Sequence, residues 1–469
     1  MKKKRIGYST IVKRNLKYSN IDGSAYAASS GFSNSYLNPY AIALGASNEQ
    51  IGLLTAIPNL LGRISELSSS PIIEYFKERK KTIKLFKILQ MLMWVPVFFV
   101  FLAPQHAIWL LILFFTIETI SSSIITPIWD SLMGDVVPDE IKGRYFGGRN
   151  RITDFSHLVS ILIAGLLLQY FANFNLVYGF GLIFFVSIIG KLISLIYVNK
   201  MYEPEYSTYK ESEFSFKDFI KRMNRTNYGI FVIYLSLLMF SVHIAAPFFT
   251  VYMLRDLQFN YLTFTIVIAI SIVARIVSGP IWGRHSDRFG NFTVIALTGL
   301  LVSFIPLFWL LSTNIIYLII VELFSGFVWS GFDLASFNFV FDTVVPEKRV
   351  RAISYYHVLV GIGVFLGATL GGYLIKFGTM FWSSIYLVFI ISGVLRFLVS
   401  AIFLPKIREV KKVRKISKGK LLWSVISSEI TLGLTYPRIL FRKRPRIPKK
   451  TLEKLIDEVK RFLERTFKE

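Results

Sequence analysis

The residues in this chain most able to do chemistry are acids placed inside long apolar runs. Glu118 lies about eleven residues into one run, and Glu322 and Asp333 lie in another, centred near residue 327. A formal charge in hydrocarbon costs at least ~2.5 kcal/mol unless it faces a cavity or an opposite charge. These acids are therefore candidates for binding a proton, another cation or a cationic substrate. The alternative is a structural ion pair with Arg63 or Arg275.

Arg63 and Arg275 occupy equivalent places in two similar segments of the sequence. Either they neutralise Glu118 and Glu322, or they clamp an anionic substrate, and the sequence leaves both interpretations open. Arg63 also precedes Glu66 by three residues, a spacing that brings two side chains together on one face of a helix. We therefore expect Glu66 to have a structural role.

Further polar groups lie in the runs that carry few acids or bases. The first run contains Asn34, Tyr36 and several serines, and a helix this polar cannot face lipid on all sides, so it is expected to line a water-filled path. His243 is suited either to a hydrogen bond between helices or to carrying a proton. His157 and His357 stand at the ends of their runs and are expected to be peripheral.

The charged stretch WGRHSDRFGN (282–291) separates two apolar runs. Its glycines Gly283 and Gly290 allow the chain to reverse sharply, and Asp287 can accept the free N–H groups at the start of the next helix. Arg288 then needs an acidic partner. The acids available at the ends of two other runs are Asp130, Asp135 and Asp342.

The composition of the whole chain indicates a membrane protein. Of its 469 residues, 53% are hydrophobic, and the mean hydropathy is +0.52. Apolar runs long enough to cross the roughly 30 Å of hydrocarbon as helices recur between about residues 22 and 405. We identify twelve, centred near residues 33, 60, 93, 120, 158, 186, 239, 272, 301, 327, 363 and 392.

The placement of charge predicts the orientation. Lys and Arg concentrate in the loops after the second, fourth, sixth, eighth and tenth runs, whereas the loops on the other side hold only Arg255 and Lys376. The positive-inside rule therefore places both termini in the cytoplasm of a cell membrane. The formal net charge of +25 lies mostly in residues 1–19 and 406–469, as expected for contact with anionic lipid, so we expect no nucleic-acid partner.

The two halves of the chain resemble each other at an offset near 208 residues. VVPDEIKGRYF (136–146) aligns with VVPEKRVRAIS (344–354), and residues 63–83 align with residues 275–295. The sequence therefore predicts an all-α membrane protein made of two six-helix repeats. Its expected parts are residues 1–199, a linker at 200–226, residues 227–405, and a basic tail at 406–469 that contains an amphipathic helix.

These features together are similar to the major facilitator superfamily. Gly283, Asp287, Arg288 and Gly290 match its loop signature, G-x-x-x-D-R-x-G, at the place of that family's second copy. At the first copy, Glu78 and Arg79 stand at the Asp-Arg positions, but Lys81 replaces the final glycine. The resemblance, over about residues 18 to 405, implies twelve transmembrane helices and a central cavity between the halves. It also implies that these loops, with Asp130, Asp135 and Asp342, form a latch that closes the cytoplasmic side in the outward-open state. The alternative is a solvated charged turn that only orients the protein.

Enzymatic activity is not expected. The chain has no cysteine, and it contains no nucleotide-binding loop, metal-ligand motif or nucleophile elbow, so we expect no cofactor and no metal. The sequence predicts a monomeric secondary transporter that moves a small solute by alternating access, coupled to protons or another gradient. The alternative is a transporter-like membrane sensor or scaffold that acts through its tail.

Overall fold

The computed structural model describes residues 10–138, 141–204, 215–345, 349–377 and 383–410, with Val413 and Gly419. Every regular element within these ranges is a helix. Residues 205–214 of the predicted linker lie outside the described residues, as do nearly all of the predicted tail beyond residue 410 and the amphipathic helix expected in it.

Within the described residues, the first half of the chain forms nine α-helices, of which α5 and α6 belong to one membrane-spanning segment. They are α1 (Thr10–Phe32), α2 (Leu37–Ala43), α3 (Asn48–Ser65), α4 (Ser69–Phe76), α5 (Arg79–Leu92), α6 (Trp94–Phe99), α7 (Ala107–Val136), α8 (Lys142–Ala172) and α9 (Leu176–Asn199).

A short helix, α10 (Phe216–Arg222), precedes the second half. The helices of the second half are α11 (Asn227–Ala245), α12 (Phe248–Val251), α13 (Tyr261–Phe289), α14 (Asn291–Leu301), α15 (Ile305–Phe308), α16 (Ile315–Thr343), α17 (Arg349–Phe377) and α18 (Ser384–Phe403).

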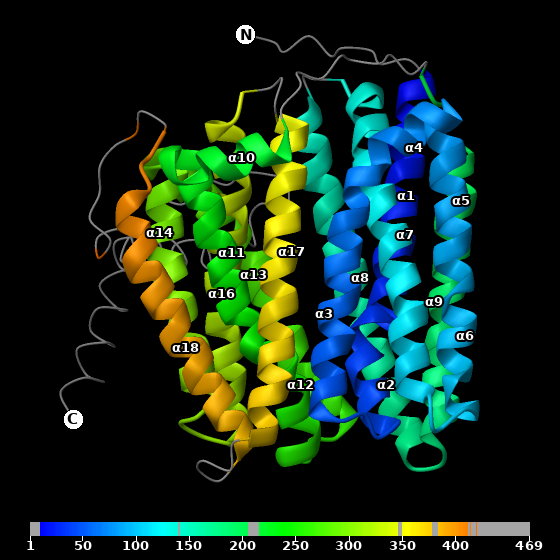
Figure 1. The fold of residues 1–469 in the computed structure, drawn as a ribbon. Helices are drawn as coiled ribbons and strands as arrows, with labels where there is room; N and C mark the ends of the chain where they lie inside the picture. Colours follow the sequence, from blue (N-terminus) through cyan, green and yellow to red (C-terminus); the bar gives the residue numbers. More distant parts are fainter. Residues whose placement is uncertain are drawn as a thin grey trace, which may run out of the picture. The chain divides into compact units, whose positions relative to one another are not determined.

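Ten helical segments of the described chain are long and apolar enough to cross a membrane, so the predicted count of twelve is not confirmed by length and composition. The first two predicted runs, which form α1 and α3, are absent from the ten. Polar residues such as Asp22 and Arg63 lower their hydropathy. Both helices nevertheless run beside the others (Figure 1), where α1 packs against α8 and α9, and α3 packs against α7 and α17.

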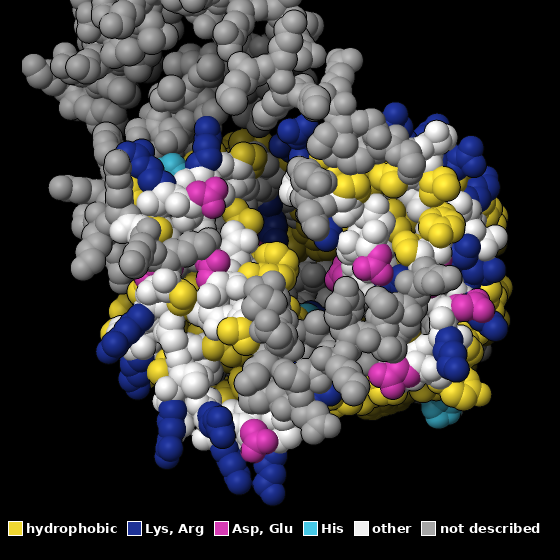
Figure 2. Space-filling view, turned by 90° about the horizontal axis from the view of Figure 1, so that it is seen from above, with side chains coloured by type: hydrophobic (Ala, Val, Ile, Leu, Met, Phe, Trp, Pro, Cys, Tyr) yellow, Lys and Arg dark blue, Asp and Glu magenta, His cyan; other side chains and the backbone are white. Residues whose placement is uncertain are grey.

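The helix bundle has two chemically different ends. We call the end at which α5 and α14 begin the basic end; it lies at the top of Figure 1. Figure 2 looks onto this end and shows Lys and Arg side chains along much of its rim, with a hollow near the middle. We call the other end the opposite end.

Contacts between the two halves close the opposite end. The Tyr36 hydroxyl lies 2.7 Å from Oγ1 of Thr265, and Arg255 donates to Oδ1 of Asn48 at 3.3 Å. Lys376 lies 3.7 Å from Glu49. The backbones of α3 and α17 also approach closely, since a Cβ added at Gly52 would meet the Ala368 carbonyl. The halves therefore meet tightly where α3 begins and α17 ends.

At the basic end, matching asparagines join the start and the finish of each half. Asn15 and the backbone of Tyr202 exchange two hydrogen bonds, of 3.0 and 2.9 Å. Asn227 and the backbone of Arg408 exchange two of 2.8 and 2.9 Å. The same contact thus recurs in both halves.

The residue after each of these backbone contacts is a glutamate that caps a helix. Glu203 accepts from the N–H groups of Arg79 and Lys80, at 2.7 and 3.1 Å, at the start of α5. Glu409 accepts from the N–H of Phe292, at 2.8 Å, at the start of α14. A carboxylate there satisfies free N–H groups and the helix dipole. The sequence repeat is therefore also a repeat of contacts.

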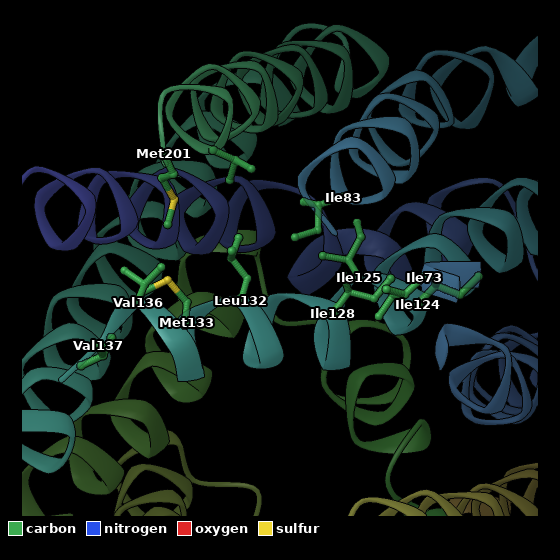
Figure 3. Packing of buried hydrophobic residues seen from close by; sticks show 11 residues of the cluster. Ile73, Ile83, Ile124, Ile125, Ile128, Leu132, Met133, Val136, Val137 and Met201 are labelled. Atoms are coloured by element: carbon green, nitrogen blue, oxygen red, sulfur yellow. The ribbon is translucent and has the colours of Figure 1, made fainter. Parts of the chain in front are cut away.

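A cluster of buried aliphatic side chains holds the basic end of the first half together (Figure 3). Ile124, Ile128 and Leu132 of α7 pack with Ile83 of α5 and Met201, which follows α9. Inside a membrane such packing stabilises through van der Waals contact, because lipid is as apolar as the side chains themselves. The cluster fixes α7, which carries several of the candidate residues.

Candidate functional site

A buried group of charged side chains lies inside the first half, where three helices meet. Asp22 of α1 accepts hydrogen bonds from Nζ of Lys87 (α5) at 2.7 Å and from Oγ of Ser194 (α9) at 2.6 Å. Lys87 also donates to Ser194. Asp22 and Lys87 are only 2% and 6% exposed. We call these three residues the Asp22 group.

Glu118 forms a second buried ion pair in the same half. Its Oε1 lies 3.0 Å from Nζ of Lys191 in α9, and both residues are almost fully buried. The alternative in which Arg63 or Arg275 pairs with Glu118 is therefore not the arrangement in this structure, where Lys191 is the partner. The ammonium of Lys191 also lies over the rings of Tyr26 and Trp94, at 5.2 and 6.0 Å, which favours a buried cation.

A cavity of about 240 Å³ adjoins the Asp22 group. Its walls include Asp22, Lys87, Gln90 and Tyr26, together with Ser122, Ile125, Thr126, Trp129, Asp130 and Arg149. The guanidinium of Arg149 lies 4.2 Å above the Trp129 ring and 4.0 Å from Oδ2 of Asp22. Asp130, predicted as part of the latch, instead lies at this cavity, and it is exposed.

The two acids of α16 lie apart from each other and from Glu118. Oε1 of Glu322 accepts from the indole N–H of Trp309 at 3.3 Å, inside the second half. Asp333 pairs with Arg275 at 2.6 Å, with both side chains nearly half exposed. The alternative prediction of an ion pair with Arg275 thus holds for Asp333. The three acids do not form one central site in this conformation.

A chain of charged groups connects the halves along α3 and α17. Arg63 pairs with Glu66 at 2.7 Å, as their spacing predicts. The other oxygen of Glu66 lies 2.5 Å from Nδ1 of His357, on α17. The expectation that His357 is peripheral is therefore wrong. Arg63 does not neutralise Glu118, and its guanidinium remains 39% exposed.

Three further candidates are hydrogen-bonded within the protein. Tyr36 is fully buried, and its hydroxyl donates to the Ile161 carbonyl at 2.7 Å, so it ties helices together instead of lining an open path. Asn34 is exposed, at the 3₁₀ turn (Asn34–Tyr36) between α1 and α2. Nδ1 of His243 lies 2.9 Å from the Met239 carbonyl of its own helix.

The loop between α13 and α14 forms the predicted tight turn. Gly290 has a φ of +94°, and a Cβ there would collide with Glu409. Gly283 packs near Leu334 of α16. Asp287 and Arg288 are both exposed, and Arg288 lies over the ring of Phe289 at 5.0 Å.

Asp342, one of the three acids expected near Arg288, hydrogen bonds to Asn291 instead. Oδ2 of Asp342 accepts from Nδ2 of Asn291 at 2.5 Å, and Asn291 also accepts from Ser286. The loop therefore connects to the end of α16 through Asn291. The latch is expected in the outward-open state, so the contact of Arg288 with an acid stays a prediction for that state.

In the first loop, Arg79 pairs with Asp135, and both are expected to belong to the latch. NH1 of Arg79 lies 2.6 Å from Asp135, and the Arg79 side chain is 1% exposed. The sharp turn, however, falls at Lys77, with a φ of +55°, and Glu78 is exposed beside it. Lys77 is thus the counterpart of Gly290, and Arg79 that of Asn291. Placing Glu78 and Arg79 at the Asp-Arg positions was an error of register.

Each loop therefore joins its own half instead of bridging the two. Arg79 and Asn291, the first residues of α5 and α14, each bind the aspartate near the end of the fourth long helix of their half, Asp135 or Asp342. Among the described residues, no three or more His, Cys, Asp or Glu side chains lie close enough together to hold a metal ion.

Comparison with known proteins agrees with this architecture. The sequence profile of the Major Facilitator Superfamily matches residues 23–244 and again residues 230–450, once for each repeat. The chain belongs to the major facilitator superfamily. No curated protein sequence matches it.

Several solved structures of major facilitator superfamily transporters share the fold. The nucleoside transporter NupG is 14% identical, with a TM-score of 0.62 over 85% of this chain and 99% of its own. A bacterial homologue of the iron transporter ferroportin in an inward-facing state is 12% identical, with a TM-score of 0.64 over 85% and 99%. The xylose transporter XylE from E. coli, partially occluded and inward open, is 12% identical, with a TM-score of 0.62 over 87% and 100%.

Sequence reasoning missed the basic residues buried in this transporter fold. Lys87 and Lys191 each lie within a predicted membrane run, yet neither is among the residues that the sequence predicted as functional. Asp22, in the polar first run, is not among the predicted acids either. The signal was present, because a lysine inside an apolar run needs an acid nearby. Which acid it meets depends on how the helices pack.

Proposed function

We propose that this chain is a secondary active transporter, which moves a small polar solute across a membrane by alternating access and is driven by a gradient of protons or of the solute. The observation that carries the proposal is the difference between the two ends. Contacts such as Tyr36–Thr265 and Lys376–Glu49 join the halves at the opposite end, whereas Figure 2 shows a hollow at the basic end.

The charge pattern supports a cytoplasmic location for the basic end. Positive loops remain on the cytoplasmic side of cell membranes, so both termini would be cytoplasmic in a plasma-membrane protein. In that orientation this conformation is open inward. The rocking of one half against the other would close the basic end and open the opposite end. We expect a monomer in contact with membrane lipid, with no catalytic activity.

Arg63 and Arg275 are our candidates for contacting the solute. They are counterparts in the two halves, and their side chains remain 39% and 45% exposed although each is paired with an acid. A partly exposed ion pair has little net stability, so a polar group of the solute can replace one partner at small cost. Each half thus offers a partly exposed pair of an arginine and an acid, which favours a solute with charged or strongly polar groups.

Reconstituted vesicles test the proposal. Purified protein in vesicles with an imposed pH gradient would be offered labelled nucleosides, sugars, amino acids, carboxylates and metal ions. We expect at least one to accumulate, and we expect Arg275→Gln and Asp333→Asn to reduce its uptake at least tenfold. Arg284→Gln is the matched control, because Arg284 is an exposed arginine on the same helix.

The outcome also decides between the two functional classes. If no compound in the panel is taken up under any imposed gradient, transport is wrong, and the alternative of a membrane sensor or scaffold is favoured. If uptake occurs but Arg275→Gln leaves it unchanged, the assignment of the solute contacts is wrong.

A further inference from the structure

We propose that Asp22 binds the coupling proton of this transporter, which makes the Asp22 group its proton site. The inference rests on the transport function proposed above. It replaces Glu118, Glu322 and Asp333 with a residue whose importance emerges when the two halves are compared.

The repeated contacts at the basic end define which positions correspond. Asp22 is seven residues after Asn15, and Tyr234 is seven residues after Asn227. In the same way, Lys87 and Gly299 each lie eight residues after the first residue of α5 or α14. Ser194 and Ser400 each lie nine residues before the capping glutamate of their half. The counterparts of the Asp22 group are therefore Tyr234, Gly299 and Ser400.

These three counterparts also meet in space, without any charge. The Tyr234 hydroxyl lies 3.5 Å from Oγ of Ser400, and Ser400 donates to the Gly299 carbonyl at 3.2 Å. A side chain at Gly299 would collide with the Tyr234 hydroxyl. The tyrosine thus fills the space that Asp22 and Lys87 fill in the first half.

The two halves pack at this point with different chemistry. Both halves need the three helices to pack at this point, and the second half achieves that with neutral side chains. The first half uses a buried ion pair, whose desolvation cost often exceeds its Coulombic gain. The fold itself does not require the charges, so a function must account for their presence.

The cavity beside Asp22 provides a route for protons. Its volume is about 240 Å³, and its lining includes both the buried Asp22 and the exposed Asp130. The space is large enough and polar enough to hold several water molecules. A proton can therefore pass from the solvent near Asp130 to the buried carboxylate.

The groups around Asp22 come from every helix that packs against it. Lys87 and Arg149 contribute positive charge from α5 and α8, and Tyr145 of α8 also lies near. Tyr26, one turn further along α1, hydrogen bonds to Ser122 of α7 at 2.9 Å. Two neighbouring charges, Lys191 and Glu118, neutralise each other.

The binding step involves one proton and one bond. A proton from the solvent adds to a carboxylate oxygen of Asp22, and Lys87 and Arg149 keep their own protons. The ion pair between α1 and α5 is thereby lost, and the contacts that hold α1 against its neighbours weaken. Proton binding would thus change the packing of the helix that leads to the closed contacts of Tyr36.

Infrared difference spectroscopy tests proton binding without a known solute. Spectra of the protein in lipid at low and high pH would be subtracted to reveal the C=O stretch of protonated carboxyl groups. We expect Asp22→Asn to lose one band that Glu118→Gln and Glu322→Gln keep. Tyr234→Phe is the matched control, since it alters the neutral counterpart in the second half. An unchanged spectrum in Asp22→Asn overturns the proposal.

Two further measurements keep the proposal testable. If Asp22→Asn fails to fold because Lys87 is left unpaired, the double variant Asp22→Asn/Lys87→Met removes both charges and is used instead. With a solute found by the vesicle panel, we expect Asp22→Asn to retain solute exchange and to lose accumulation driven by a pH gradient. Accumulation that persists in this variant overturns the coupling role.

The two proposals can fail separately. A band lost in Asp22→Asn supports proton binding at Asp22 even if no solute is transported; the transport function and the coupling role then fail, and the proton-binding site stands. Transport by the wild type with an unchanged infrared spectrum contradicts the proton site alone.

Discussion

At the scale of single residues, the buried charges of the first half are explained by their partners. Glu118 and Lys191 are 2% and 3% exposed and lie 3.0 Å apart. Leaving one charge of such a pair buried alone typically costs about 3–5 kcal/mol, whereas removing both can be nearly neutral. Substituting one residue of the pair, and then both, therefore shows whether the two charges are coupled in stability.

We predict that Lys191→Met lowers the free energy of unfolding by about 3–5 kcal/mol and that Glu118→Gln/Lys191→Met recovers most of the loss. Thermal unfolding in detergent, followed by tryptophan fluorescence, measures both. Lys200→Met is the control, because Lys200 is exposed at the end of the same segment. A double variant as unstable as the single one would show that the two residues are not coupled.

At the scale of elements, the two turns at the basic end solve one geometric problem with different residues. Gly290 (φ +94°, ψ 151°) adopts a conformation that is essentially restricted to glycine. Lys77 (φ 55°, ψ 4°) adopts the left-handed conformation, which costs a lysine about 1 kcal/mol. Sequence alignment placed the missing glycine at Lys81, but Lys81 lies inside α5.

We predict that Lys77→Gly leaves stability unchanged or slightly raised, because relief of the left-handed conformation offsets the added freedom of the unfolded chain. Lys81→Gly should lower stability by about 1 kcal/mol, the usual cost of glycine within a helix. Thermal unfolding of the two variants compares them directly. The reverse order would show that the turn lies at Lys81.

A matching change in the second half is expected to be harmful. Gly290→Ala should destabilise the protein by about 1–3 kcal/mol, because alanine rarely adopts this conformation and its Cβ would collide with Glu409. Gly283→Ala is the control in the same measurement, since Gly283 has space around it. Equal stability of both variants would contradict the strain argument.

At the scale of the whole molecule, transport requires the contacts at the opposite end to break in each cycle. The halves meet there through Lys376 and Glu49, which lie 3.7 Å apart. The chain has no native cysteine, so engineered cysteine pairs can report this contact without interference.

We predict that cross-linking the variant Glu49→Cys/Lys376→Cys abolishes transport and that reduction of the cross-link restores it, because the link holds the opposite end closed. The control pair is Asp256→Cys/Ser383→Cys, whose side chains lie 2.7 Å apart at the same end but within one half. Solute uptake into vesicles is the measurement. Unimpaired uptake in the cross-linked test pair would rule out alternating access through this contact.

Sequence alone was sufficient for the fold class, the repeat and the asymmetry of charge. Apolar runs of membrane-spanning length leave the backbone few options besides helices, and the glycine-bounded WGRHSDRFGN stretch encodes its own turn. These properties are local, or they repeat along the chain. They can therefore be recognised without knowing which helices are neighbours.

Only the tertiary structure decided which charges meet. Asp22, Lys87 and Ser194 lie on three helices far apart in sequence. Glu118 pairs with Lys191 because helix packing places their side chains 3.0 Å apart, whereas Arg63 and Arg275 pair with Glu66 and Asp333. Buried charges are stabilised by partners within a few ångströms, and those distances depend on helix packing. The sequence determined that charges would have to be paired inside the membrane, and the fold determined the pairs.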